Sequence, residues 1–364
     1  MKITSLLLLA MFVSSLHALQ FNSSGYFTIV QFTDLHYGTS DKLDTQTTEL
    51  QKNILSWIKP DFVVISGDGV YAKDGVGSGW FKSQWQKFTS PTVEAKIPYA
   101  FTLGNHDAEA DLTPRQIVRL DATSPYSIRN KSEGIQDTAN FRVPVYASKN
   151  TSQLAAHVWV LDSGSYGCED VKGGYGCIET DVVDWYDEES KKIKAQHGSN
   201  VHHLAYFHIP LPEYLDVYNT EEIYGHANEG VYCSVWNTGF FARAKNNGDI
   251  SAMFVGHDHN NDFGGFYEGI ELVYGRKSGY GLYGDLHGAR VVTLKENYDA
   301  QGNLYVTREH YVVDVSGMIQ PPTPMKKRTG SKQISCTSAD GGATLMSHLQ
   351  KILLAVIVIF YLIF

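Results

Sequence analysis

The apolar residues of this chain fall mainly in short runs rich in β-branched and aromatic side chains, the pattern of buried strands. Three such runs lie in the first third of the chain, at 26–33, 62–66 and 99–103. Between the first two, apolar residues at helical spacing predict a helix over 42–58, which Pro60 ends. A strand, a helix and a second strand in this order predict a parallel βαβ unit whose loops meet at one edge of the sheet.

Further runs predict more strands, so the domain is expected to combine strands and helices throughout. A second helix is expected to begin after Thr113, because threonine is a favoured N-cap and Pro114 suits the first helical position. Two later helices are predicted at 181–195 and 239–247. Strands are predicted at 141–146, 157–161, 202–207, 252–255 and 270–274, and a late hairpin pairs 289–294 with 304–313.

Both ends of the chain carry sequence patterns of processing and membrane targeting. Residues 1–18 combine Lys2, an apolar run and Ala18 before the expected cleavage point, which predicts a secretory signal peptide. The apolar run 352–364 is shorter than the roughly 20 residues that a transmembrane helix needs. Because a polar spacer and small residues precede it, 344–364 predicts a GPI-attachment signal, with a single-pass anchor as the alternative. The candidate attachment residues are Ser338, Asp340 and Gly341.

These end segments leave 19–320 as one folded domain, followed by a polar stalk at 321–343. The protein is therefore expected in the secretory pathway, at the cell surface or in an endomembrane lumen, held to the membrane by its C-terminal anchor. Asn-x-Ser/Thr sequons agree with this route and predict exposed, glycosylated positions. The three sequons begin at Asn22, Asn130 and Asn150.

Composition places the chain among globular proteins with an acidic balance of charge. It has 364 residues, 43% of them hydrophobic, and 39 acidic against 30 basic side chains, which gives no reason to expect nucleic acid as a partner. Cys168 and Cys177 flank a Gly-rich loop and are expected to form a disulfide in an oxidising compartment. Cys233 and Cys336 are left over, and Cys336, in the expected stalk, is expected to be free or intermolecular.

Polar residues of one chemical kind follow five of the predicted strands. They are Asp34 and His36, Asp68, Asn105 with His106 and Asp107, His208, and finally His257 and His259. Carboxylates, imidazoles and an amide, without thiolates, suit iron, zinc or manganese. Two such ions that share a bridging carboxylate can generate a hydroxide and stabilise the leaving oxygen of an in-line displacement at phosphorus.

The order of these motifs carries a family resemblance. DLH, GDGVY, GNHD, an isolated His and GHDH, between Asp34 and His259, resemble the five-block signature of the calcineurin-like metallophosphoesterases, which include the purple acid phosphatases. AYFHIPLPEY, GHDHNNDF and YGRKSGYGLYG are similar to a plant and fungal branch of purple-acid-phosphatase-like proteins, over roughly 26–313. The resemblance implies an α/β fold, a four-layer αββα sandwich of two mixed sheets flanked by helices, with a dinuclear metal site at the strand C-terminal edge.

The resemblance also implies roles for individual residues. Asp34, His36, Asp68 and His259 would hold a first metal ion, and Asp68, Asn105, His208 and His257 a second, so that Asp68 bridges the two. His106 would contact the scissile phosphate and protonate the leaving oxygen, and Asp107 would orient it.

Tyr71 is the residue at which the chain departs from the purple phosphatases. It stands three residues after the bridging Asp68, where those enzymes have a charge-transfer tyrosine, but His36 replaces their glycine in the first block. Tyr71 is therefore expected to be either a ligand or a hydrogen-bonding neighbour, and no purple colour is predicted.

These inferences predict a metal-dependent phosphoric ester hydrolase. The favoured activity is that of a phosphomonoesterase in which a metal-bridging hydroxide attacks phosphorus in line. The first alternative is a phosphodiesterase acting on nucleotides or lipid headgroups. The second is a surface binding protein that keeps the metals without turnover. His226, just before the site in the chain, is a candidate substrate contact.

Overall fold

The three apolar runs near the N-terminus form the parallel half of a six-stranded sheet. β2, β3 and β4 pair in parallel, as the βαβ order predicts. β15 pairs antiparallel with β2 and with β16, which confirms the late hairpin. The strand order is β17-β16-β15-β2-β3-β4. The bounds are β2 (Tyr26–Phe32), β3 (Phe62–Ser66), β4 (Tyr99–Thr102), β15 (Gly288–Tyr298), β16 (Leu304–Asp314) and β17 (Ile319–Gln320).

The other apolar runs form a ten-stranded mixed sheet, in which β7, β10, β12 and β14 are parallel neighbours. The order is β1-β6-β7-β10-β12-β14-β13-β11-β18, with β5 beside β6. The bounds are β1 (Leu19–Gln20), β5 (Glu133–Gly134), β6 (Phe141–Ala147), β7 (Asn150–Val160), β10 (His202–Tyr206), β11 (Glu222–Tyr224), β12 (Ile250–Val255), β13 (Gly264–Tyr267), β14 (Ile270–Tyr274) and β18 (Lys326–Lys327). A separate hairpin joins β8 (Tyr166–Cys168) and β9 (Val171–Tyr175).

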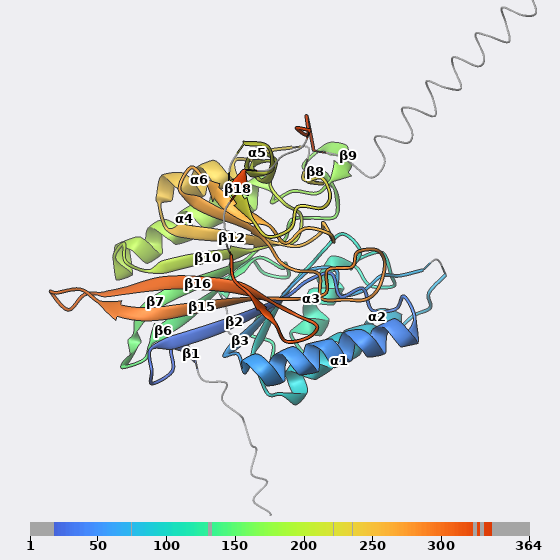
Figure 1. The fold of residues 1–364 in the computed structure, drawn as a ribbon, viewed down its shortest axis with the longest axis horizontal. Coiled ribbons are helices and arrows are strands. Elements are labelled where there is room, and N and C mark those ends of the chain that lie inside the picture. Colours follow the sequence, from blue (N-terminus) through green and yellow to red (C-terminus); the bar gives the residue numbers. More distant parts are fainter. Residues whose placement is uncertain are drawn as a thin grey trace, which may run out of the picture.

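Helices cover the outer faces of both sheets (Figure 1). Their bounds are α1 (Asp41–Ile58), α2 (Trp80–Glu94), α3 (Pro114–Asp121), α4 (Thr180–His197), α5 (Glu213–Thr220) and α6 (Phe240–Asn247). The predicted start of α3 is confirmed, because Thr113 and Gln116 form a capping box. α2 and α5 are absent from the sequence prediction, and α2 carries Pro91 in its interior.

Three hydrophobic layers hold this stack together. The central one lies between the sheets and includes Phe62, Val158 and Phe254. A second layer packs α4 to α6 on the ten-stranded sheet, and a third packs α1 to α3 on the six-stranded sheet. The predicted four-layer αββα arrangement is therefore confirmed, and the carboxyl ends of β2, β3, β4, β10 and β12 carry the candidate site.

The C-terminal part of the described chain packs on the domain. β18 pairs with β11, and Cys336 forms a disulfide with Cys233, 103 residues earlier. The prediction that Cys336 is free or intermolecular is therefore wrong, and two described parts of the segment expected as a stalk, 326–327 and 331–336, are held to the domain. The predicted Cys168–Cys177 disulfide is confirmed.

The computed structural model describes residues 18–73, 75–129, 133–220, 222–234, 236–322, 326–327 and 331–336. Most of the expected signal peptide, the sequon residue Asn130, the candidate lipid-attachment residues and the C-terminal apolar run lie outside these ranges. Asn22 and Asn150 are exposed, as sequon positions should be. Within the described ranges, no helix has the length and apolar character needed to cross a bilayer.

Candidate metal centre

The ends of five strands bring the predicted ligands to one place at the edge shared by the two sheets. Asp34 and His36 follow β2, Asp68 follows β3 and Asn105 follows β4, whereas His208 follows β10 and the two histidines of the GHDH motif follow β12. All seven side chains are buried: Asp34, His36, Asp68, Asn105, His208, His257 and His259. Residues from distant parts of the chain therefore form one buried polar cluster.

Six of these side chains form two overlapping groups. The ligand atoms of Asp34, His36, Asp68 and His259 lie within 4.8 Å of one another, and so do those of Asp68, His208 and His257. His36 Nε2 and His259 Nε2 are 2.9 Å apart, and His208 Nε2 is 3.2 Å from Asp68 Oδ2. Asp68 belongs to both groups, which is the arrangement expected of a carboxylate that bridges two ions.

Several buried donor atoms in this pocket fit a metal ion. Within the described part of the chain, Asn105 Oδ1 has no hydrogen-bond partner, although buried polar atoms are normally satisfied. His208 Nδ1 lies 2.9 Å from the carbonyl oxygen of Ser66, which leaves Nε2 as the ligand nitrogen. His259 Nδ1 is held in the same way by the carbonyl of Tyr283, at 3.0 Å. These residues could hold two metal ions.

The two buried carboxylates draw positive charge into the pocket. Burial raises the pKa of Asp34, but a hydrogen bond from His259 and the charge of His208 together bring it well below its ordinary value. Burial lowers the pKa of His208, but the charge and hydrogen bond of Asp68 outweigh this and raise it to about 10. Because metal binding displaces protons from its ligands, the proton that His208 collects beside Asp68 marks a place where a cation is favoured. Burial instead lowers the pKa of the other three ligand histidines, His36, His257 and His259.

The backbone around the ligands is strained. φ is 54° at Asp34, 50° at His36, 52° at Asp68 and 80° at His257, in the left-handed region that costs a non-glycine residue about 1 kcal/mol or more. Such strain is typical of functional sites that the surrounding structure holds in place. Close packing adds a further constraint, since a Cβ at Gly104 would lie 2.2 Å from Asp68 Oδ1.

Asp107 does not orient His106, so that expectation is wrong. Its carboxylate accepts backbone N–H groups from Asp68 at 2.9 Å, Gly104 at 2.7 Å and Val70 at 3.2 Å. It therefore ties the loop after β3 to the loop after β4. The carboxylate beside His106 Nδ1 is that of Glu109, whose Oε2 is 2.7 Å away.

His106 lies at the edge of the ligand cluster. Its backbone N–H donates to Asp68 Oδ1 at 2.9 Å, and its ring centroid is 5.5 Å from that of His36. Burial alone lowers the pKa of His106, but the charge of Asp68 and the hydrogen bond to Glu109 outweigh burial. The net result is a pKa raised to about 9. His106 also borders an open hollow of about 570 Å³ that Tyr71, Ala72, Lys73, Val76 and Glu109 help to line.

Tyr71 and His226, the two other residues predicted near the site, lie in different surroundings. Tyr71 is half-buried, with its ring edge-on to His106 at 5.2 Å and to His36 at 6.4 Å between centroids. It therefore flanks the first ligand group. His226 has a side chain that is 45% exposed and lies 3.1 Å from Asp262 Oδ1. This contact positions His226 on the loop beside β13, and a role toward substrate stays a prediction.

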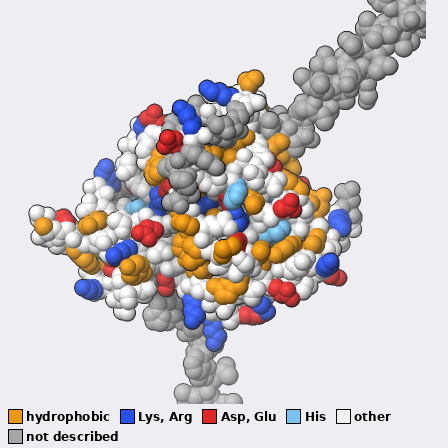
Figure 2. Space-filling view, viewed as in Figure 1, with side chains coloured by type: hydrophobic (Ala, Val, Ile, Leu, Met, Phe, Trp, Pro, Cys, Tyr) orange, Lys and Arg blue, Asp and Glu red, His pale blue; other side chains and the backbone are white. Residues whose placement is uncertain are grey.

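Aromatic rings that sequence reasoning missed pack on the histidines. Tyr175, within the Cys168–Cys177 loop, meets the His257 ring edge-on at 4.3 Å. Tyr283 stacks on His259 at 4.1 Å and is half exposed. On the face shown in Figure 2, acidic and basic side chains are interspersed.

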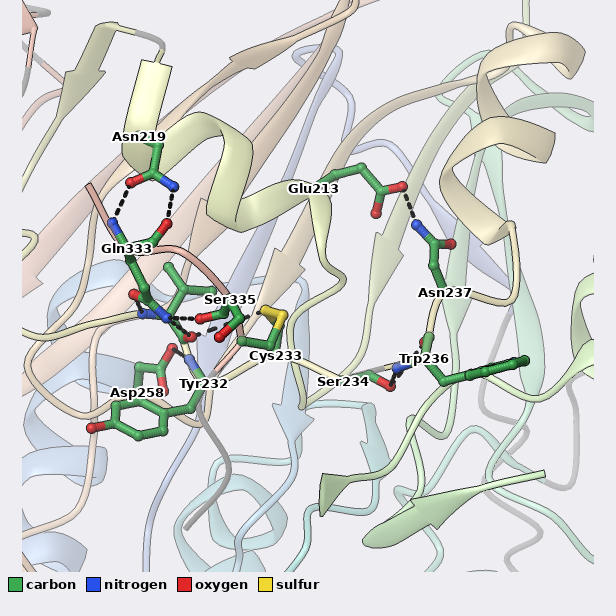
Figure 3. Close-up of a disulfide and its surroundings, with 12 residues drawn as sticks. Glu213, Asn219, Tyr232, Cys233, Ser234, Trp236, Asn237, Asp258, Gln333 and Ser335 are labelled. Carbon is green, nitrogen blue, oxygen red and sulfur yellow. Dashed lines mark hydrogen bonds between the residues drawn. A yellow bond between two sulfur atoms is a disulfide. The ribbon is translucent and has the colours of Figure 1, made fainter. Parts of the chain in front are cut away.

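The GHDH loop is also supported from behind, by the segment that contains Cys233. Asp258 Oδ2 accepts the backbone N–H of Tyr232 at 3.1 Å and the hydroxyl of Tyr274 at 2.6 Å. Figure 3 shows Tyr232 beside Asp258 and next to the disulfide. Gln333 continues the support, because its side chain bonds both the N–H and the carbonyl of Val231, at 2.8 and 2.7 Å.

Comparison with known proteins agrees with this site. A model of the calcineurin-like phosphoesterase family matches residues 27–261. The probable inactive purple acid phosphatase 29 of Arabidopsis thaliana is 31% identical over 316 residues, 78% of this chain and 80% of that protein. Phosphatase DCR2 of Saccharomyces cerevisiae is 28% identical, over 67% of this chain and 46% of that protein.

Among solved structures, a dimetal phosphatase from Danio rerio aligns with 73% of this chain and 95% of its own at 15% identity, with a TM-score of 0.45. The family match spans more than half of this chain, from β2 to the GHDH loop, and includes all seven candidate ligands. The chain therefore belongs to the calcineurin-like phosphoesterase family and is a metallophosphoesterase.

Proposed function

We propose that this protein is a phosphomonoesterase that hydrolyses its substrate with two metal ions. The observation that carries the proposal is the double ligand group around Asp68, directly beside His106 and an open hollow. The ions would be held by Asp34, His36, Asp68 and His259 on one side and by Asp68, Asn105, His208 and His257 on the other. When bound, such ions lower the pKa of a water molecule and polarise phosphoryl oxygens. The ligand set suits iron, zinc or manganese ions.

Side chains of the protein would position the metal ligands and protonate the leaving group. Asp107 fixes the two loops that carry Asp68 and Asn105, so the ligands keep their places relative to the phosphate. His106 lies where it can give a proton to the departing alcohol oxygen. The alcohol portion would then occupy the hollow beside His106.

Paired assays test this function. Metal-replete protein is given p-nitrophenyl phosphate and bis-p-nitrophenyl phosphate, before and after chelation and metal restoration. We expect faster hydrolysis of the monoester, loss of activity on chelation, and recovery with zinc, manganese or iron. Asp68→Asn should remove the activity, whereas Glu222→Gln, an exposed carboxylate on β11, serves as the control. Faster hydrolysis of the diester would replace the proposal with its first alternative.

The second alternative is a metal-containing binding protein without turnover. It is raised by the name of a relative, the probable inactive purple acid phosphatase 29 of Arabidopsis thaliana. The complete set of buried ligands and the presence of His106 argue against it here. Stoichiometric binding of two metals with hydrolysis of neither ester would favour the binding protein.

For localisation, we infer a secreted route that ends at a membrane through a GPI anchor. Two disulfides and the exposure of Asn22 and Asn150 support an oxidising compartment and accessible sequons. Treatment of intact membranes with phosphatidylinositol-specific phospholipase C tests the anchor. Release of the protein is expected, and retention after treatment would contradict a lipid anchor.

A further inference from the structure

The side chain of Glu109 meets the imidazole of His106 in a short, well-formed contact. Glu109 Oε2 is 2.7 Å from His106 Nδ1, and the two side chains are 32% and 21% exposed. The backbone N–H of Glu109 also donates to the carbonyl of His106 at 3.2 Å, so a tight turn brings the two residues together. The pair therefore results from local backbone geometry as well as from opposite charge.

The other contacts of His106 leave the orientation of its ring to Glu109. Its backbone is anchored by the N–H bond to Asp68 Oδ1. Tyr71 and His36 meet the ring edge-on, at 5.2 and 5.5 Å between centroids, and confine it sideways. These contacts do not select which nitrogen faces the reaction. A carboxylate on Nδ1 does, because it holds the proton of that nitrogen and leaves Nε2 on the opposite side.

The neighbouring carboxylate cannot take this part. Both oxygens of Asp107 are occupied by backbone N–H groups of Asp68, Val70 and Gly104. Its side chain is also fully buried behind the loops, whereas Glu109 faces the hollow.

We propose that Glu109 is the positioning residue for His106, and that it directs His106 Nε2 at the oxygen of the leaving alcohol. This inference rests on the proposed phosphomonoesterase function. As a water oxygen forms the new bond to phosphorus, the ester P–O bond breaks and the Nε2 proton passes to the departing oxygen. The proton released by the water restores the imidazolium, while the Nδ1 proton stays on its hydrogen bond to Glu109.

This role makes the effect of Glu109 depend on the leaving group. p-Nitrophenolate departs readily without protonation because p-nitrophenol is a much stronger acid than phenol, whereas phenolate benefits from a proton in the transition state. A positioned general acid contributes roughly 100-fold to 10,000-fold to rate. Loss of positioning should remove a part of this general-acid contribution, so we expect Glu109→Ala to lower kcat on phenyl phosphate about 10-fold to 100-fold. On p-nitrophenyl phosphate kcat should change little, and KM should change little on either substrate. Glu109→Gln should lie between, since its amide oxygen still accepts a hydrogen bond.

A double-mutant cycle tests whether Glu109 acts through His106. On phenyl phosphate, the His106→Ala and Glu109→Ala double variant should be no slower than His106→Ala alone, because residues that act as one unit are non-additive. Glu94→Gln is the matched control, since Glu94 makes an exposed ion pair with Lys52 at 2.7 Å on α2. An equal loss on both substrates, or an additive double variant, would overturn the proposal.

A second readout does not depend on turnover. In 15N-histidine-labelled, metal-replete protein with the His106 ring titrated to its neutral form, the ring nitrogen shifts of His106, assigned by loss in His106→Ala, report which nitrogen keeps its proton. Nδ1 should be protonated in the wild type, and this preference should be lost in Glu109→Ala. An unchanged shift pattern would overturn the proposal by itself. If the wild type hydrolyses neither ester, the proposed function and the catalytic part of this inference both fail, while the shifts still decide whether Glu109 holds the ring.

Discussion

Removal of the Cys233–Cys336 disulfide is predicted to cost more stability than removal of the Cys168–Cys177 disulfide. The perturbation is a Cys233→Ser and Cys336→Ser double variant, which leaves no unpaired thiol from this bond. The disulfide joins residues 103 apart and holds the end of the described chain against the segment that supports the GHDH loop. Its removal releases this long loop in the unfolded state.

The magnitude follows from the lengths of the two closed loops. The chain-entropy relation gives about 4.7 kcal/mol at 25 °C for a loop of this size. For Cys168–Cys177, with a separation of 9, the same relation gives about 2.6 kcal/mol. The two double variants should therefore differ by about 2 kcal/mol in free energy of unfolding, with the long-loop variant the less stable.

Guanidinium unfolding followed by tryptophan fluorescence measures both effects. The long-loop variant should have the lower midpoint and the larger m-value, because an uncrosslinked denatured chain exposes more surface. Unfolding of the wild type in the presence of a reductant, which opens both disulfides, supplies the matching reference. A long-loop variant as stable as the wild type, or more stable than the Cys168 and Cys177 variant, would refute the loop-entropy reasoning.

Three further predictions concern the site and the acid stability of the domain. His259→Ala should mainly lose one of the two metals and His257→Ala the other, as metal analysis would reveal; equal loss of both ions in each variant would contradict the split. Iron-loaded wild type should lack a tyrosinate charge-transfer band, so an absorption that disappears in Tyr71→Phe would show that Tyr71 is a ligand. Burial raises the pKa of Glu271, but the hydrogen bond from His310 and the charge of Arg308, with smaller contributions, together outweigh it and lower the pKa from 4.5 to about 2. The ion pairs of Glu271 therefore add stability above pH 4.5 that is lost as the pH falls towards 2, and Glu271→Gln should flatten the stability profile over that interval.

The parts of the fold that the sequence predicts are those in which local pattern and final environment agree. β3 and β4 are buried on both faces and β2 is so over most of its length, so their sequences are mainly apolar. α3 has a Thr-Pro start that forms a capping box. α2 escapes prediction because Gly79 supplies no side-chain cap and Pro91 lies inside the helix. Packing on α1 and on the sheet, which no local pattern reveals, stabilises it.

The candidate site, like the fold, is predictable only in part. The ligands are predictable because their chemistry repeats at the ends of strands, and parallel strands bring those ends together. The carboxylate partner of His106 is not predictable, because the choice between Asp107 and Glu109 depends on the backbone conformation of one turn. The disulfide partner of Cys336 is also not predictable, because nothing in a polar segment that follows several prolines indicates that it packs against Cys233.

The unpredicted contacts explain how the strained ligands are held. Four ligand residues in the left-handed region together store several kcal/mol, at about 1 kcal/mol or more for each. Asp107 fixes the loop of Asp68 through backbone N–H groups, and Tyr232 does the same for the GHDH loop through Asp258. Tyr232 is adjacent to Cys233, so the support of the second loop continues into the disulfide and Gln333. The segment that looks like a stalk in the sequence thus lies on the path that keeps metal ligands in a strained conformation, and its removal should affect the site as well as stability.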